Sequence, residues 1–473
     1  MDLNRDTDRM FAYHEATKHS PESIRRSRFR LDWDNMPDPF RRYDGVPLVD
    51  LPAHPPPPEV PTLDVLAGRR GDATHAGGAE FLSRLLDYSA AISARKRVPS
   101  TGYHYSLRVN PSSGNLHPTE FHFATRGLAG WEDGLYHYRV ATHQAEQRVR
   151  GDWVARLVDS PVPVVFVLAT IAWREAWKYR DRAYRYCLLD LGHAWESLAL
   201  AALALNCDSQ VIGHFADDAV AEACGLRDEW PMLLITVEGE GLALEARGAP
   251  PSQWLGGIPN VLSPQEVEYP LIDGIQFSCR VAEPGRPWNG WRPVPTQVSG
   301  GRPFGRVVRR RRSALDYIGG DRTISLDQLQ TLLEVARFED GFVRLYVFAH
   351  RVRDLEPGLY DGGLRRLRAG DVRLTAAALS LGQDLAGNSC VTFSMIADLE
   401  RAAHEFGNRG YRYAHFEAGA IGQRLYLASE AMGFQATGIG AFYDDEVHAC
   451  LGVEHVIYHF ACGFAVKDAR LES

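Results

Sequence analysis

The sequence predicts a soluble α+β protein in which one type of domain occurs twice along a single chain. Its 473 residues exceed one ordinary core and favour two domains of roughly 200 residues each. Apolar residues make up 45% and charged residues 24% of the chain, which is typical of a globular protein. An internal repeat then indicates that the two domains are copies of each other.

The repeat pairs residues 184–226 with residues 411–453 without a gap. Fifteen of the 43 aligned positions are identical, including the opening Tyr-Arg-Tyr and an Ile-Gly-x-Phe-x-Asp-Asp-x-Val segment. Gly-Leu-Tyr at 134–136 and again at 358–360 precedes each block by a similar distance. Chance explains this agreement poorly, so we expect a tandem duplication.

Each copy has the same order of elements. A long helix, expected over about 185–206 and 412–433, has small apolar residues on much of its surface, which suits close helix packing. A glycine-containing turn leads to a short helix that begins at two aspartates, whose carboxylates are expected to cap it. Strands are predicted at 120–127, 162–173, 232–239, 343–352 and 456–466. Alternating helices and strands, with antiparallel pairing around GLYHY, indicate an α+β domain used twice.

Three segments lie mostly outside the duplicated regions. We expect an N-terminal extension over 1–79, of which residues 1–51 wrap the surface, a first domain over 80–247, a linker over 248–304 and a second domain over 305–473. Residues 52–61, PAHPPPPEVP, predict a stiff polyproline spacer, with a ligand for a proline-binding module as the weaker alternative. The linker segment PGRPWNGWRPVP can cover a pocket or simply connect the halves.

Charge, cysteines and hydropathy narrow the function classes. A formal net charge of −8 disfavours a nucleic-acid partner, although the run Arg309–Arg312 is strongly basic. The seven cysteines form no CxxC pair, which favours buried thiols in a reducing cytosol. The histidines lack ligand spacing, so no metal site is expected. The apolar run 162–173 is too short for a membrane span, and the N-terminus does not resemble a signal peptide. We therefore expect a cytoplasmic protein without a membrane partner.

Two motifs carry the candidate chemistry. Arg311, Arg312 and Ser313 precede a predicted helix, where guanidinium groups, a hydroxyl and the field of the helix suit a phosphate monoester. The Pro-bounded loop 111–118, PSSGNLHP, offers hydroxyl, amide and backbone donors and can hold the edge of a planar polar cofactor. Taken alone, the arginine run also fits a solvated basic face, and the loop also fits an ordinary surface turn.

PSSGNLHP, the following GLYHY and the segment KYRDRAYRY with its long helix resemble the SagB-type (thiazole-oxidase-like) dehydrogenases of the nitroreductase superfamily. The resemblance covers roughly residues 80–245 and 305–470. It implies a nitroreductase-like fold with FMN bound where two domains meet. In this chain the tandem copies would form an intramolecular pseudo-dimer, and further oligomerisation stays open.

The resemblance also assigns cofactor-binding residues. The second half would hold the phosphate and the flavin ring through Arg311, Arg312, Ser313, Gly438, Ile439, Gly440, Lys467 and Arg470. The first half would contribute Pro111, Ser112, Ser113 and Asn115 from its loop. The family usually has a basic residue two positions after the serine, where this chain has Leu315, so a neighbouring arginine would supply that charge.

Each half lacks one of the two cofactor-binding motifs that the other half retains. Residues 343–348 follow the helix ending near Ala336 too closely to leave room for a PSSxN loop. Residues 52–71 stand where the first half should carry its Arg-x-Ser motif, and Glu245 aligns with Lys467, so a phosphate there would meet an anion. Because fusion allows one of two symmetric sites to decay, we expect one FMN per chain.

Lys178 and Tyr179 match a Lys-Tyr pair implicated as acid and base in azoline-oxidising relatives, whereas the second half has Glu405 and Phe406 at these positions. A surface lysine beside a packing tyrosine is the simpler alternative. The leading hypothesis is FMN-dependent oxidation or reduction of a small-molecule or peptide substrate, with NAD(P)H as a candidate reductant. A narrower hypothesis is an azoline (thiazoline or oxazoline) peptide dehydrogenase in natural-product maturation. A hypothesis of another class is a non-catalytic scaffold for a maturation partner.

Overall fold

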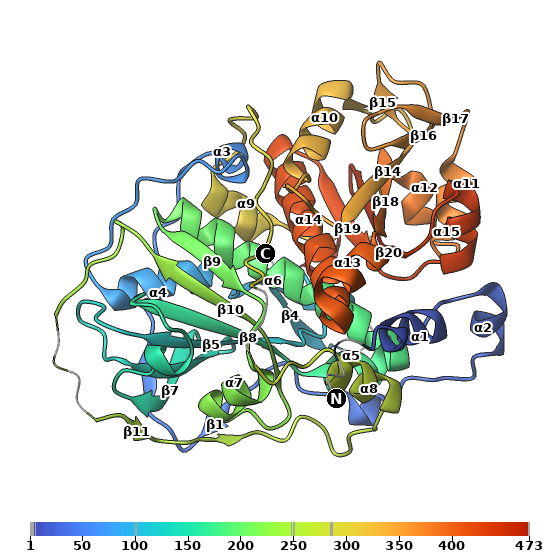
Figure 1. Ribbon diagram of the computed structural model, residues 1–473. Helices are drawn as coiled ribbons and strands as arrows, with labels where there is room; N and C mark the ends of the chain where they lie inside the picture. Colours follow the sequence, from blue (N-terminus) through green and yellow to red (C-terminus); the bar gives the residue numbers. More distant parts are fainter. Residues whose placement is uncertain are drawn as a thin grey trace.

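The computed structural model describes residues 4, 6–99, 102–246, 248, 251–283 and 287–471. Two sheet-containing halves stand side by side and meet along two long helices, α6 (Ala183–Ala204) and α14 (Gly410–Met432), near the centre of the molecule (Figure 1). The two halves form the expected α+β pseudo-dimer within one chain. Both long helices begin two residues earlier than the sequence suggested, within the usual scatter of helix ends.

Each half contains an antiparallel sheet with the same central order of five strands. In the first half the order is β6 (Gly134–Arg139), β5 (Thr119–Thr125), β8 (Val164–Thr170), β10 (Trp230–Glu238) and β9 (Asp208–Ile212). In the second half it is β16 (Gly358–Asp361), β14 (Val343–Ala349), β18 (Val391–Ala397), β20 (Val456–Gly463) and β19 (Gln435–Ile439). The register corresponds as well, since Phe166 faces Ile235 in one sheet and Phe393 faces Phe460 in the other.

Further strands extend or flank these sheets: β1 (Tyr43–Asp44), β2 (Leu48–Asp50), β3 (Ile92–Arg97), β4 (His104–Arg108), β7 (Gln144–Arg150), β11 (Gln253–Trp254), β12 (Ile258–Pro259), β13 (Ile324–Ser325), β15 (Val352–Arg353) and β17 (Arg366–Ala369). The other α-helices are α1 (Asp8–Ala16), α2 (Pro21–Arg26), α3 (Thr62–Leu66), α4 (Gly78–Asp87), α5 (Ala172–Tyr179), α7 (Asp217–Cys224), α8 (Pro270–Ser278), α9 (Phe304–Arg310), α10 (Leu326–Val335), α11 (Arg373–Leu379), α12 (Asp384–Asn388), α13 (Leu399–Phe406) and α15 (Asp444–Leu451). The strand predicted at 162–173 ends at Thr170, because the chain turns there into α5.

The long helices touch at Gly192 and Gly419, which are equivalent positions of the repeat. A Cβ atom on Gly192 would lie 2.2 Å from the carbonyl oxygen of Phe416, and one on Gly419 would lie 2.1 Å from that of Leu189. Two backbones approach this closely only where neither residue carries a side chain. The reciprocal contacts mark a pseudo-two-fold axis and confirm the close packing expected of these helices.

Two buried aspartates, Asp217 and Asp444, connect each half to the other. The ion pairs are Arg182–Asp444 and Arg185–Asp444, both at 2.9 Å, Arg409–Asp217 at 2.6 Å and Arg412–Asp217 at 3.0 Å. Each aspartate begins its short helix, α7 or α15, but neither side chain caps that helix as expected. The facing arginines take the carboxylates instead, because a buried guanidinium needs an anionic partner.

One continuous apolar core crosses the junction between the halves, and a smaller core lies on each sheet. All seven cysteines are free thiols, and all but Cys450 are buried, as expected. The stretch from Ala172 to Ala204 is long and apolar enough to cross a membrane by composition, but 89% of its most apolar window is buried in the core.

The N-terminal extension does more than wrap the surface. Helix α1 buries Met10, Tyr13 and His14, and Arg185 of α6 donates hydrogen bonds to the carbonyl of His14 and, at 3.0 Å, to the hydroxyl of Thr17. This segment therefore supplies two hydrogen-bond acceptors, a carbonyl and a hydroxyl, to a buried arginine at the junction. Helix α1 thus packs into the junction between the halves in addition to lying along the surface.

Candidate functional site

A cavity of about 1110 Å³ lies between the halves. Every site residue predicted from the sequence lines it except Lys467: Pro111, Ser112, Ser113, Asn115, Lys178, Tyr179, Arg311, Arg312, Ser313, Gly438, Ile439, Gly440 and Arg470. The structure therefore brings together a loop of the first half, the end of α5, the segment after α9 and the turn after β19. It also adds aromatic wall residues that the motifs did not reveal, among them Trp33, Tyr103, Tyr105, Tyr186, Tyr426 and Tyr458.

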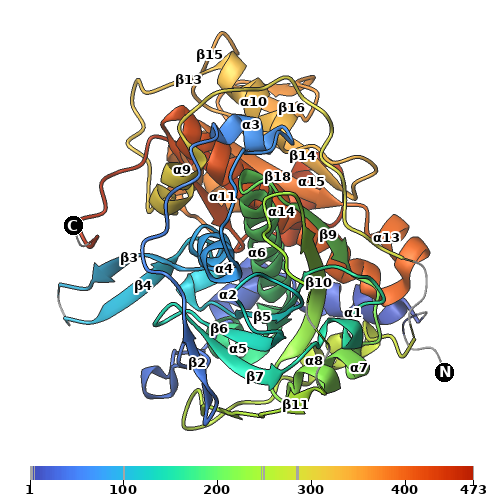
Figure 2. The same cartoon turned by 90° about the vertical axis from the view of Figure 1, so that its left-hand side faces the viewer.

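Lys467 is exposed and does not line this cavity, so the structure does not bring it together with the other predicted site residues. The C-terminal tail turns at Asp468, whose carboxylate pairs with Lys96 at 2.7 Å and with Arg470 at 2.9 Å. That turn brings Arg470 to the wall, and Lys96 from the β3–β4 hairpin joins it. The tail runs beside this protruding hairpin, where the Arg97 N–H donates to the carbonyl of Arg470 at 2.9 Å (Figure 2).

Arg311 is a buried cation of the cavity wall that is held by backbone carbonyl groups of the first half. It is 4% exposed, its Nε donates to the carbonyl of Val109 at 3.0 Å, and its Nη2 donates to that of Arg108 at 3.2 Å. Its Nη1 is buried and has no hydrogen-bond partner in the described part of the chain. A buried guanidinium N–H without an acceptor is costly, and an anionic group in the cavity would satisfy it.

The remaining arginines of the basic run divide between the surface and the site. Arg309 pairs with Asp87 at 3.1 Å and Arg310 approaches Glu430 at 3.7 Å, whereas Arg312 lines the cavity. Burial, followed by the charge of Arg311, lowers the pKa of Arg312 to about 10. Two adjacent, partly desolvated guanidinium groups favour an anion between or beside them.

Tyr426 connects the two second-half motifs. Its hydroxyl lies 2.7 Å from Ser313 Oγ and accepts the N–H of Gly438 at 3.0 Å. Its ring packs 4.9 Å from the guanidinium carbon of Arg311. The repeat places Ala199 opposite Tyr426, so a comparison of the two copies could have identified this residue.

Neither Gly438 nor Gly440, at the end of β19, has room for a side chain. A Cβ atom on Gly438 would lie 1.9 Å from Tyr458 Oη, and one on Gly440 would lie 2.1 Å from Tyr186 Cε1. Tyr186 donates its hydroxyl to the carbonyl of Gly440 at 3.0 Å. The N–H of Gly440 has no acceptor within the residues that the structure describes, so it remains available to a ligand in the cavity.

The hydroxyls of the PSSGN loop do not face a ligand as the sequence suggested. Asp190 of α6 accepts the Ser112 hydroxyl at 2.6 Å, and the Ser113 N–H and hydroxyl at 3.0 and 2.9 Å. These serines therefore anchor the loop to the central helix. The loop still lines the cavity, and the buried Oδ1 of Asn110 lacks a partner in the described residues.

Lys178 and Tyr179 reach this same loop. Gly114 has φ +57°, and a Cβ atom there would lie 2.7 Å from Tyr179 Oη and 3.0 Å from Lys178 Nζ. Burial, then the nearby charge of Glu175, raises the pKa of Tyr179 well above its ordinary value. Tyr179 is therefore a neutral phenol at neutral pH and can donate a proton or a hydrogen bond. Both side chains are partly buried beside the cavity, unlike a freely exposed surface pair.

The pseudo-equivalent site on the other side of the axis is filled by the linker. Trp288 is 5% exposed and stacks on Tyr413, the counterpart of Tyr186, with centroids 3.9 Å apart and an interplanar angle of 8°. The N–H of Gly213, the counterpart of Gly440, donates to the carbonyl of Trp288 at 2.8 Å. The linker segment thus covers a pocket, the first of its two interpretations, although residues 284–286 lie outside the described range.

What remains of the second site is a pocket of about 370 Å³. Glu405 and Phe406, which replace Lys178 and Tyr179, line it together with Trp288 and Trp291. The two sites are therefore unequal in size, in chemistry and in what occupies them.

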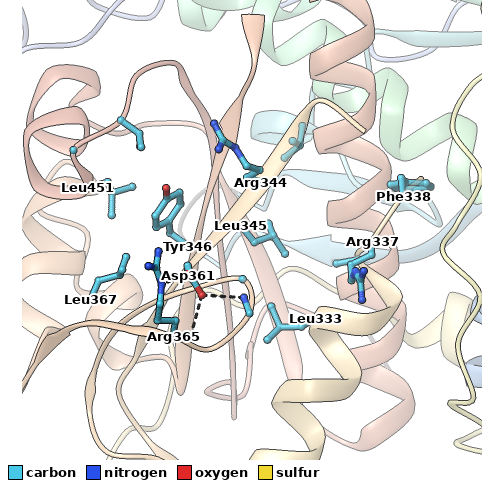
Figure 3. A pocket seen from close by; sticks show the side chains of 16 residues that line it. Leu333, Arg337, Phe338, Arg344, Leu345, Tyr346, Asp361, Arg365, Leu367 and Leu451 are labelled. Carbon is cyan, nitrogen blue, oxygen red and sulfur yellow. Dashed lines mark hydrogen bonds and ion pairs between the residues drawn. The ribbon is translucent and has the colours of Figure 1, made fainter. Parts of the chain in front are cut away.

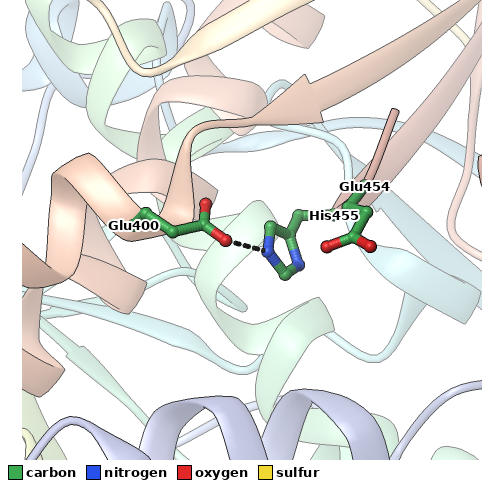
Figure 4. Close-up of side chains that lie close together, drawn as sticks. All are labelled: Glu400, Glu454 and His455. Atoms are coloured by element: carbon green, nitrogen blue, oxygen red, sulfur yellow. Dashed lines mark hydrogen bonds and ion pairs between the residues drawn. The ribbon is translucent and has the colours of Figure 1, made fainter. Parts of the chain in front are cut away.

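Two other features belong to neither site. A groove of about 810 Å³ on the second half is lined by Arg337, Arg344, Arg365 and several leucines (Figure 3). Glu400, Glu454 and His455 place possible metal-ligand atoms within 4.8 Å of one another, with Glu400 bonded to His455 at 2.8 Å (Figure 4). Both glutamates are exposed, and such groups gather on surfaces without an ion, so we assign no metal there.

Comparison with known proteins places both halves in one family. The Nitroreductase family model matches residues 82–240 and 308–466. A protein of Methanocaldococcus jannaschii described as a nitroreductase is 28% identical over 167 residues, covering 31% of this chain and 83% of that protein. The trifolitoxin-processing protein TfxB of Rhizobium leguminosarum bv. trifolii is 30% identical over 142 residues, covering 27% of this chain and 38% of that protein.

The similarity in structure extends over both halves together. The crystal structure of a nitroreductase-like protein from Anabaena variabilis matches 97% of this chain and 99% of its own, with a TM-score of 0.77 and 25% identity. The family model occurs once in each half, and its two matches cover more than half of the chain. The chain therefore belongs to the nitroreductase family, a family of oxidoreductases, and carries two domains of this kind in tandem.

Proposed function

We propose that this protein is an FMN-dependent oxidoreductase that acts on a small-molecule or peptide substrate in the cavity between its halves. The supporting observation is that one cavity is lined by Arg311, whose buried Nη1 lacks a partner in the described residues, and by Gly440, whose N–H has no acceptor among them. Ligand pockets usually measure about 300–1,000 Å³. A cavity of about 1110 Å³ thus has room for a flavin and for part of a substrate.

The donor set fits this cofactor. Arg311, Arg312 and Ser313 would hold the phosphate, and Arg470 and Lys96 would add positive charge at the wall. The backbone of the Gly438–Gly440 turn and the PSSGN loop would hold the ring system. When bound, the flavin supplies hydride or electron transfer, while the protein positions the substrate and moves protons.

Lys178 and Tyr179 are the proposed proton-transfer residues. Their polar ends meet at Gly114, on the loop that forms the first-half wall. Because burial keeps Tyr179 protonated, the phenol suits a hydrogen-bond or proton donor, and Lys178 is the basic member of the pair. In an oxidation, the base would take the substrate proton while the cofactor takes the hydride.

The test is a spectrum of the purified protein with quantification of the flavin released on denaturation. We expect a yellow protein with one FMN per chain, because Trp288 occupies the second site. We also expect the flavin to be reduced by NAD(P)H or by a chemical donor. A ratio near two would contradict the single site, and a colourless protein that does not take up FMN would favour the scaffold hypothesis.

A narrower candidate is an azoline peptide dehydrogenase. The similarity to TfxB, a protein named for trifolitoxin processing, and the position of Lys178 and Tyr179 at the cavity favour it. Here Lys178→Ala should abolish turnover of an azoline peptide and leave the FMN content unchanged. Normal turnover in that variant would exclude this role. We further propose a cytoplasmic location, consistent with the free thiols, and no nucleic-acid or membrane partner.

A further inference from the structure

A second carboxyl group lies beside Asp190 at the base of the PSSGN loop. Glu175 of α5 is 0% exposed, and neither of its carboxyl oxygens has a hydrogen-bond donor within the described residues. Its carboxyl group lies within hydrogen-bonding reach of Asp190, which already accepts three hydrogen bonds from Ser112 and Ser113. Two buried carboxylates in contact cannot both be charged, so this geometry requires a proton.

The repeat shows that Glu175 is specific to the half with the complete loop. The counterpart of Asp190 is Glu417, which accepts the N–H groups of Phe342 and Val343 at 2.6 and 3.1 Å. The counterpart of Glu175 is Ala402, which is buried and apolar. An acidic residue of the central helix therefore anchors the preceding segment in both halves. A second carboxyl group accompanies it only where the loop forms a cavity wall.

We propose that Glu175 and Asp190 form a carboxyl pair that carries one proton at neutral pH and thereby anchors the PSSGN loop of the cofactor cavity. Protonated Glu175 donates a hydrogen bond to Asp190. Asp190 stays anionic and keeps its hydrogen bonds to Ser112 and Ser113. The pair positions the loop and does not itself touch the ligand through Glu175, which lies outside the cavity lining.

The surroundings agree with this distribution of charge. Burial, then the charge of Asp190, raises the pKa of Glu175 well above its ordinary value, and burial raises that of Asp190 to about 6. The titratable and charged groups that face the pair are Lys178 and Tyr179 of α5, Cys187 of α6 and Tyr458 of β20. Within this set, only Lys178 supplies positive charge.

The first test counts protons in unfolding and does not depend on activity. In the unfolded chain Glu175 loses its proton near pH 4.3, whereas the folded chain retains it. The unfolding equilibrium constant of the wild type should therefore rise about tenfold more per pH unit than that of Glu175→Gln between pH 6 and 8. Equal slopes would overturn the shared proton. The infrared carbonyl band of protonated carboxyl groups should be weaker in Glu175→Gln than in the wild type by the contribution of one group, which provides a check on the folded protein; an unchanged band would contradict the proposal.

The second test measures FMN affinity and rests on the proposed function. Asp190→Asn should weaken FMN binding about tenfold, because a charged acceptor of the loop is lost. Glu175→Gln should bind FMN nearly as the wild type does, since its amide still donates to Asp190. Glu417→Gln is the matched control in the other half and should leave FMN affinity unchanged.

Unchanged affinity in Asp190→Asn would refute the anchoring role. If the wild-type protein bound no FMN, the proposed function would fail, and the proton count would still test the pair independently.

Discussion

Replacement of Trp288 by alanine tests how the second site is closed. The Trp288 ring is nearly fully buried, stacks on Tyr413 at 3.9 Å and makes edge contacts with Trp195 and Trp291 at 5.9 and 4.8 Å. Burying about 200 Å² of aromatic surface at ~25 cal/mol per Å² is worth about 5 kcal/mol as an upper estimate. The backbone bond from the Gly213 N–H survives the change. We therefore expect a loss of about 3–4 kcal/mol, within the range for large core truncations.

The assay is urea unfolding followed by circular dichroism, with FMN released and counted in parallel. Leu374→Ala is the control, because Leu374 is 86% exposed, lies outside the cavity and should change the free energy of unfolding by less than about 1 kcal/mol. The FMN ratio of Trp288→Ala should stay at one, since the first half lacks an Arg-x-Ser motif. A loss below about 1 kcal/mol in Trp288→Ala would refute the view that this ring substitutes for a ligand in the second site.

Four further predictions concern the site, the contact between the long helices and a buried histidine of the first sheet. Gly114→Ala should lower the free energy of unfolding by about 1–2 kcal/mol, because Gly114 has a positive φ. It should also lower turnover more than about tenfold, because the new methyl group displaces the ends of Lys178 and Tyr179. Unchanged kinetics would contradict this contact. Gly419→Ala should destabilise the protein by about 3 kcal/mol or more in thermal unfolding, because the methyl group meets backbone atoms that cannot rotate away; a neutral effect would disprove the close crossing. Arg311→Gln should weaken FMN binding at least about tenfold in fluorescence titration, and unaltered affinity would remove Arg311 from the phosphate site. Although burial opposes the charge of His137, hydrogen bonds to two glutamates raise its pKa to about 9. Its stabilising contribution is therefore complete below about pH 6.5 and is lost as the pH rises through 9. In His137→Gln the free energy of unfolding should not show this decline with pH.

The repeat predicted the fold because it preserves the residues that build the interface. Gly192 and Gly419 are identical in the two copies and meet at the axis, as the small-residue surface of the helices suggested. The sequence could not reveal that Asp217 and Asp444 bind arginines of the opposite half. An aspartate at the start of a helix can either cap that helix or pair with a distant arginine. Local pattern alone does not decide between these partners.

The location of site segments was predictable where a motif determines the backbone conformation. The location of a single side chain was less predictable where it depends on contacts with residues distant in the sequence. The PSSGN loop and the Gly438–Gly440 turn lie where the sequence indicated. Lys467 does not line the cavity, whereas Arg470 does, because Asp468 pairs with Lys96 of the first half and the tail turns there. Glu175 and Tyr426 belong to no motif, yet both differ chemically from their counterparts in the other copy. Comparing the two copies of the repeat could therefore have identified site residues that the resemblance to a family did not indicate.

The exchanged ion pairs have a consequence for how this chain can evolve. Produced as separate polypeptides, each half would leave its arginines and its aspartate without counter-ions at the surface where they meet. Removing one partner of such a buried pair typically costs about 3–5 kcal/mol. The second half, which has Glu405 and Phe406 in place of Lys178 and Tyr179, therefore remains an obligate companion of the first. Natural selection can let its site drift while still preserving Arg409, Arg412 and Asp444.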